Sequence, residues 1–138
     1  MKKKLPCNLK VPVLFVDSAI NTDDRLVTEV FQAGGIGIVE GRTLDIPHGV
    51  RLPLSRLQNF HPEPTTQLIL IHFEDADTVC HLADSELQQF PIPVFVEVGS
   101  AAQACGAEKS GAAGLITKGY EAPGWVSQTN GLVLLQEI

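Results

Sequence analysis

The chain has 138 residues, of which 44% are hydrophobic, and it carries a formal net charge of −6. This length suits one globular domain with its own core, no apolar run is long enough to cross a bilayer, and the negative charge argues against nucleic acid as a partner. Three cysteines without a CxxC pair indicate neither a disulfide framework nor a zinc knuckle, so a reduced, cytoplasmic setting is expected.

The first third of the chain predicts a tail, a strand and a helix. Residues 1–10 are interpreted as a solvated basic tail, because prolines interrupt any apolar segment that could make a signal peptide. Val11–Val16 is an apolar, β-branched run typical of a buried parallel strand. Asp24–Ala33 predicts a helix that ends at Gly34-Gly35. The helical spacing places four apolar residues on one face: Leu26, Val27, Val30 and Phe31.

The middle of the chain predicts three strands with an unusual connection. Ile36–Val39 is the second strand, and Gly37 inside it indicates close approach of another backbone or a ligand. The segment Gly41–Gly49 is too short for a crossover helix, although parallel neighbours usually need about a dozen connecting residues. The strand-like piece Val50–Leu54 is therefore either not a parallel strand or has lost its helix. Gln67–Phe73 is the clearest core strand.

The last third of the chain continues the alternation. A helix is expected over Thr78–Phe90 with a restart at Ser85, because Ser85–Gln88 has the form of a capping box. Cys105 is expected on the buried face of a later helix. The later elements are the strand Pro93–Val98, the helix Ala101–Lys109, the strand Gly114–Thr117 and a terminal run, Leu132–Leu135, that fits a strand or a first helical turn.

The segment from His72 to His81 holds two histidines, three acids and a cysteine. Its spacing matches no known metal-ligand pattern, and acids before a helix complement the helix dipole. No metal site is therefore expected.

Alternation of strands and helices predicts an α/β fold in a single domain spanning residues 1–138. Five βα-like units in this length fit a flavodoxin-like doubly wound sheet, which includes signalling receivers. Polar and glycine residues concentrate after the strand Gly114–Thr117, where α/β proteins place their sites.

Two motifs resemble one family. Ala33-Gly34-Gly35-Ile36-Gly37 resembles the AGG-(I/L)-G turn of the nitronate monooxygenase (2-nitropropane dioxygenase-like) family, and Gly119–Gly124 resembles its G-x-E-A-x-G pattern. Residues 117–136, TKGYEAPGWVSQTNGLVLLQ, look closer to the barrel domains of this type in polyketide-synthase-like multienzymes. The resemblance extends from the first strand almost to Ile138.

The resemblance implies an FMN-dependent (β/α) barrel. With 138 residues against about 250 for a full barrel, it implies a partial TIM-type barrel of about six parallel strands with the last two missing. Trp125 occupies the position of the family's catalytic histidine, and because indole does not exchange a proton near neutral pH, no catalytic residue is assigned. The implied FMN contacts are Asp17, Ser18, Gly34, Gly35, Lys118, Gly119, Glu121 and Gly124.

Three functions follow from these alternatives. The resemblance implies an FMN-dependent oxidoreductase, of the nitronate monooxygenase or enoyl-reductase-like kind, linked to polyketide or fatty-acid synthesis. The alternative is a non-catalytic barrel remnant that acts as a structural or docking module, and the doubly wound fold would suit a receiver-like signalling domain. Open sheet edges in a partial barrel invite pairing, so a homodimer or association with a larger synthase-type protein is expected.

Overall fold

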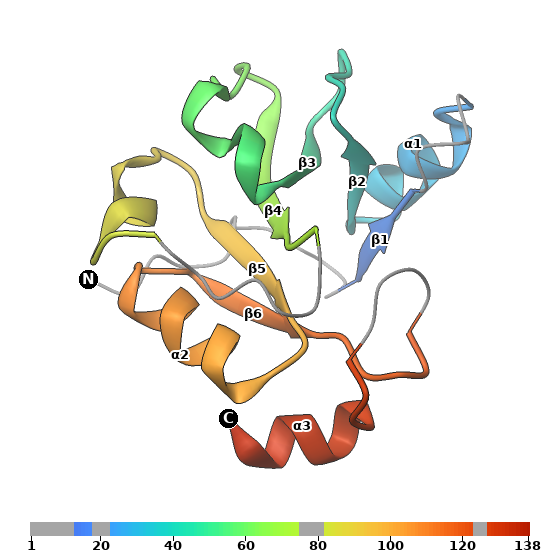
Figure 1. Ribbon diagram of the computed structural model, residues 1–138. Helices are drawn as coiled ribbons and strands as arrows, with labels where there is room; N and C mark the ends of the chain where they lie inside the picture. Colours follow the sequence, from blue (N-terminus) through green and yellow to red (C-terminus); the bar gives the residue numbers. More distant parts are fainter. Residues whose placement is uncertain (1–12, 18–22, 75–81, 123–126) are drawn as a thin grey trace.

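The computed structural model describes residues 13–17, 23–74, 82–122 and 127–138, and Figure 1 shows its one curled sheet. Each strand pairs in parallel with the next strand of the chain, which gives the order β1-β2-β3-β4-β5-β6. The strands are β1 (Leu14–Val16), β2 (Ile36–Glu40), β3 (His48–Pro53), β4 (Thr66–His72), β5 (Val94–Val98) and β6 (Gly114–Thr117).

This strand order decides between the two architectures. Chain order throughout is the order of a (β/α) barrel, and the sheet curls into half of one, so the prediction of a partial barrel is confirmed (Figure 1). The flavodoxin-like alternative is wrong, because a doubly wound sheet reverses its strand order at a switch point. The elements between the strands are α1 (Arg25–Gln32), the 3-10 helices η1 (Leu54–Asn59) and η2 (Glu86–Gln89) and α2 (Ala101–Lys109), and α3 (Gly131–Glu137) follows β6.

The connection from β2 to β3 contains no helix. Residues 41–47 link the two strands, which nevertheless pair in parallel, Val39 opposite Val50. An extended chain spans about 3.3 Å per residue, so seven residues cover the length of the five-residue strand β2 that they must run back along. The first alternative from the sequence, that Val50–Leu54 is not a parallel strand, is therefore wrong.

The helix expected over Thr78–Phe90 is wrong in the described part of that segment. Residues 82–85 are not helical, and η2 is a single short 3-10 turn. Ser85 has a left-handed φ of 64° and its N–H donates to the carbonyl of Lys109, so the expected capping box does not form. The carboxylate of Glu86 instead accepts the N–H of Ala83 at 2.8 Å.

The two faces of the sheet carry separate apolar cores. On the convex face, η1, η2 and α2 cover the strands, with Leu57, Leu87 and Ala104 in one buried cluster with Val50, Ile71 and Val96. On the concave face, a second cluster holds Ile36, Ile38, Leu68, Leu70 and Phe95, with Leu14 and Ile116 packed against it. Strand alternation therefore assigns each strand residue to one face.

Helix α1 packs closely on β2. A Cβ atom on Gly37 would lie 2.4 Å from Cγ1 and 3.0 Å from Cα of Val27, so the close backbone approach expected at Gly37 is confirmed. Val27 is buried, but Leu26, expected on the same face, is 49% exposed. Among the described residues no helix has the length and apolar character that crossing a membrane requires.

Candidate functional site

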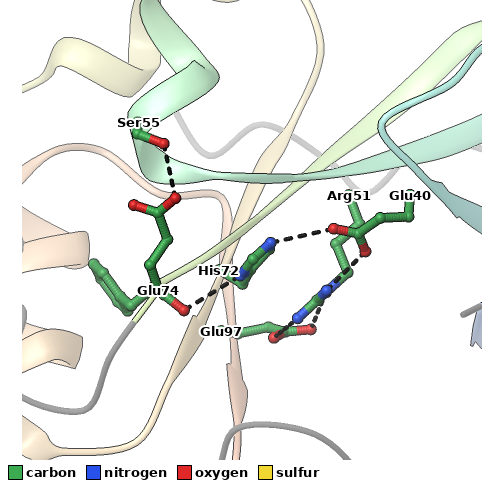
Figure 2. Close-up of polar contacts among 7 residues, drawn as sticks. Glu40, Arg51, Ser55, His72, Glu74 and Glu97 are labelled. Carbon is green, nitrogen blue, oxygen red and sulfur yellow. Dashed lines mark hydrogen bonds and ion pairs between the residues drawn. The ribbon is translucent and has the colours of Figure 1, made fainter. Parts of the chain in front are cut away.

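Four charged or titratable side chains meet at the carboxyl ends of the central strands (Figure 2). They are Glu40 on β2, Arg51 on β3, His72 on β4 and Glu97 on β5, and they form what we name the carboxyl-edge network. Glu40, His72 and Glu97 each lie two residues beyond a residue of the concave cluster, and Arg51 lies two beyond Gly49, whose added Cβ would meet Ile38 of that cluster. Alternation therefore directs all four to the inside of the half barrel. This edge is where barrel enzymes place their chemistry.

Arg51 is the centre of the network. Its Nε and Nη2 donate to Oε1 and Oε2 of Glu97 at 3.0 and 2.9 Å, and its Nη1 donates to Oε2 of Glu40 at 2.7 Å. The Glu97 side chain is only 5% exposed, against 20% for Arg51 and 23% for Glu40. A bidentate guanidinium–carboxylate pair is among the stronger polar contacts in proteins, and it fixes both side chains in orientation.

The surroundings keep Arg51 charged. Burial by itself disfavours the guanidinium and lowers the pKa of Arg51, but the hydrogen bonds to Glu97 and Glu40 outweigh it and raise that pKa above its ordinary value. The network therefore holds two carboxylates against one permanent cation.

His72 is the member of the network that comes from β4. Its Nδ1 lies 3.2 Å from the carbonyl oxygen of Phe73, and its Nε2 lies 3.3 Å from Oε1 of Glu40 (Figure 2). The second contact is within ion-pair distance, although its geometry is not that of a hydrogen bond.

Asp17 belongs to a separate ion-pair group. Its carboxylate, in a residue only 4% exposed, lies 3.1 Å from Nη2 of Arg42, and Nη1 of the same arginine contacts Asp24 at the start of α1. Arg42 thus ties the end of β1 to the amino end of α1. The predicted flavin contact Asp17 is at the carboxyl edge, but its carboxylate is engaged by this arginine.

The loop after β6 is organised around the start of α3. Both carboxylate oxygens of Glu121 accept the N–H of Gly131, at 2.9 and 3.2 Å. A Cβ on Gly119 would lie 2.1 Å from the backbone nitrogen of Gly131, so Gly119 is required by this close contact. Lys118 follows β6, and its backbone carbonyl accepts the N–H of Ser127. Of the three predicted contacts in the described part of this loop, Glu121 and Gly119 thus serve the local fold.

Gly34 and Gly35 lie at the amino end of β2, opposite to the carboxyl edge of the sheet. Gly34 has a φ of 92° and follows the end of α1, and its N–H donates to the carbonyl of Phe31, which is a helix-ending role. Gly35 precedes β2, and a Cβ there would lie 2.9 Å from the carbonyl oxygen of Val13. The structure therefore does not bring this pair together with Asp17 and Lys118. Ser18, Gly124 and Trp125 lie outside the described residues.

The carboxyl-edge network does not fit a flavin phosphate. Glu40 and Glu97 already engage Arg51, Asp17 engages Arg42, and Glu121 engages the backbone of α3. A phosphate is held by cationic side chains or by free backbone N–H groups, and Arg51, the one arginine of the carboxyl-edge network, already donates to two carboxylates. Across the parts of the chain that the structure describes, no group of three or more histidine, cysteine or acidic residues is placed to hold a metal ion.

Sequence reasoning missed the carboxyl-edge network. Its signal is an isolated polar residue near the end of each apolar strand: Glu40 after IGIV, Arg51 in VRLP, His72 after LILI and Glu97 in VFVEV. Cys105 is a correction of another kind, because it is exposed on α2 rather than buried. The buried positions of that helix are Gln103, Ala104 and Ala107.

Comparisons with protein families, curated proteins and solved structures find no match to this chain.

Proposed function

We propose that this half barrel is a non-catalytic module with a structural or docking role beside a polyketide- or fatty-acid-synthesising enzyme. The resemblance to FMN-dependent barrels suggests its ancestry. The observation that carries the proposal is that the charged groups of the carboxyl-edge network bind one another. The guanidinium of Arg51 uses Nε, Nη1 and Nη2 to hold the carboxylates of Glu97 and Glu40.

A ligand at the carboxyl edge would have to compete with the existing hydrogen bonds between Arg51 and the two carboxylates. Removing one partner of a buried ion pair costs about 3–5 kcal/mol, since the other charge is left without compensation. Glu97, at 5% side-chain exposure, is such a group. A network of this kind favours a fixed shape of the sheet over the turnover of substrates.

A docking role is supported by the two ends of the sheet. Within the described residues β1 pairs only with β2, and β6 pairs only with β5. Unpaired strand edges recruit further strands, and apolar side chains are exposed at the β1 end, including Val13 and Val16 at 46% and 40%. The partner is a second copy or a larger synthase-type protein.

The second candidate is an FMN-dependent oxidoreductase. Lys118 favours it, because alternation from Ile116 on the concave face places this lysine at the carboxyl edge, beside the network. A lysine there suits the negative charge of a reduced flavin ring. The receiver-like role has no comparable support, since it depends on a doubly wound sheet.

Titration of the purified protein with FMN separates the two candidates. A docking module shows no FMN-dependent rise in melting temperature and no shift in the flavin absorbance bands. The matched variant is Lys118→Met. A melting temperature that rises with FMN in the wild type, and fails to rise in this variant, would overturn the non-catalytic proposal in favour of the oxidoreductase.

A further inference from the structure

Helix α3 exposes most of its apolar surface. Of its aliphatic side chains only Leu134 is buried, at 1% exposure. The exposed ones are Leu132 at 66%, Leu135 at 61% and Val133 at 45%, with Ile138 at 51% directly after the helix. A helix that is apolar on almost every side is normally covered on almost every side. In Figure 1 it lies at the margin of the molecule, beyond α2.

A groove lies between α2 and the carboxyl end of α3. It has a volume of about 530 Å³, within the range of small-molecule sites. Ala104 and Cys105 of α2, Leu115 of β6 and Ile138 line it together with further alanines. The exposed α3 face and this groove together form what we name the α2–α3 surface.

Among the described residues, the charged side chains of the α2–α3 surface are all of one sign. Within that part of the chain, Glu108 and Glu137 are the charged residues that line the groove, and both are exposed. The whole chain, with these two glutamates included, has a net charge of −6. A second copy would bring the same two glutamates to the contact, and an anionic lipid surface would be repelled for the same reason. A cationic partner is attracted both by the two glutamates of the groove and by the negative net charge of the chain.

We infer that the α2–α3 surface binds a positively charged amphipathic helix of a partner protein. Its aliphatic face would pack on Leu132, Leu135 and the groove, and lysines or arginines along its flanks would meet Glu108 and Glu137. This is the helix-in-groove mode of recognition. The inference rests on the proposed docking role and identifies the surface and the partner chemistry through which it acts.

Two synthetic helical peptides test this inference. They share one pattern of leucines, and the polar face carries lysine in one peptide and glutamate in the other. Binding is measured by fluorescence anisotropy, and the maleimide reactivity of Cys105 is followed by peptide mapping in a mass spectrometer. The lysine peptide is expected to bind and to slow modification of Cys105 several-fold, while the glutamate peptide does neither.

Substitutions on the surface separate its apolar and charged parts. Leu132→Asn with Leu135→Asn should weaken the lysine peptide about tenfold or more, because two exposed leucines lose their burial. Glu108→Lys with Glu137→Lys should reverse the preference between the peptides. Leu26→Asn, on a leucine of α1 that is 49% exposed, is the control and should change nothing.

Several outcomes contradict the inference. Equal binding of the two peptides, or no binding by either, rules out the charge argument, as does unchanged Cys105 reactivity in the complex. Protection of Cys105 that rises with protein concentration alone identifies a second copy as the occupant. Stronger association with lipid vesicles than with the lysine peptide identifies a membrane. None of these readouts involves FMN, so a failure here is distinct from a failure of the non-catalytic proposal.

Discussion

Arg51 and Glu97, 46 residues apart in the sequence, hold each other by two parallel hydrogen bonds of 3.0 and 2.9 Å. The pair joins β3 to β5 across β4, and the third contact of Arg51 extends it to β2. Side chains thus connect β2, β3 and β5 at one edge in addition to the backbone ladders, and the contact of His72 with Glu40 adds β4.

Arg51→Met should lower the free energy of unfolding by about 3 kcal/mol, because Glu97 is left as a buried charge without its partner. The double variant Arg51→Met/Glu97→Gln should recover part of that loss, since the remaining amide carries no charge. Urea denaturation followed by circular dichroism measures both. Arg25→Met is the matched control and should shift the midpoint far less, because Arg25 is 88% exposed and exposed ion pairs contribute little. An equally stable Arg51→Met protein would contradict the structural role of the network.

Gly37→Ala should destabilise the fold by about 1–3 kcal/mol, the usual cost of forcing a side chain into a packed interface. The added methyl group would lie 2.4 Å from Cγ1 and 3.0 Å from Cα of Val27, so helix α1 must move away from β2. Thermal unfolding checks this. The control is Gly41→Asn: Gly41 has a φ of 58°, which asparagine tolerates, and the nearest atom to an added Cβ is 3.9 Å away. A control that destabilises as much as Gly37→Ala would refute the steric explanation.

Glu121→Ala should release the amino end of α3. The N–H of Gly131 loses the carboxylate that accepts it, and loss of such a helix-end contact costs about 1 kcal/mol. Hydrogen exchange at the amides of α3 should therefore become several-fold faster. Glu137→Ala, at the other end of the same helix, removes a carboxylate from the negative end of the dipole and should not accelerate exchange. Unchanged exchange in Glu121→Ala would leave this residue available for a ligand role.

Asp23 supplies a prediction for pH. The side-chain hydrogen bond from Arg25, followed by that from the Arg25 backbone N–H, lowers the pKa of Asp23 below its ordinary value. A carboxyl whose pKa is lower in the folded state stabilises the protein above its unfolded pKa, and this contribution is lost as the pH falls through the folded value. Carbon NMR should show Asp23 titrating at a lower pH than in Arg25→Met. Identical titration curves would contradict the assigned cause.

Much of the fold could be predicted because its elements are encoded locally. The strand Gly114–Thr117 and the helix Ala101–Lys109 have the predicted bounds, and α1 begins and ends one residue inside its prediction. Each is set by an apolar run or by capping and glycine signals within a few residues. The terminal run Leu132–Leu135 was ambiguous, and Asn130 decides for a helix because its side chain accepts the N–H of Leu132 at 2.8 Å.

The site could not be predicted in the same way, because its contacts are non-local. Glu40, Arg51, His72 and Glu97 come from four strands and meet only once the register of the sheet is fixed. A single charge inside an apolar run does not identify its partner. The glycines differ in kind: the sequence alone predicted a flavin contact at Gly34 and Gly35, and the structure adds a local role for each, at the end of α1 and at the approach of Val13.

The strand order has a consequence for synthesis of the protein. Each ladder joins a strand to the one translated immediately before it, so no strand must later enter a place between two that are already paired. The sheet can grow in the direction of translation, with β6 added last as the chain leaves the ribosome. Domains generally fold from the amino-terminal end as they are made, and short connections between paired segments speed that process. A half barrel of this order can gain or lose a terminal βα unit in evolution without rearranging the strands already in place.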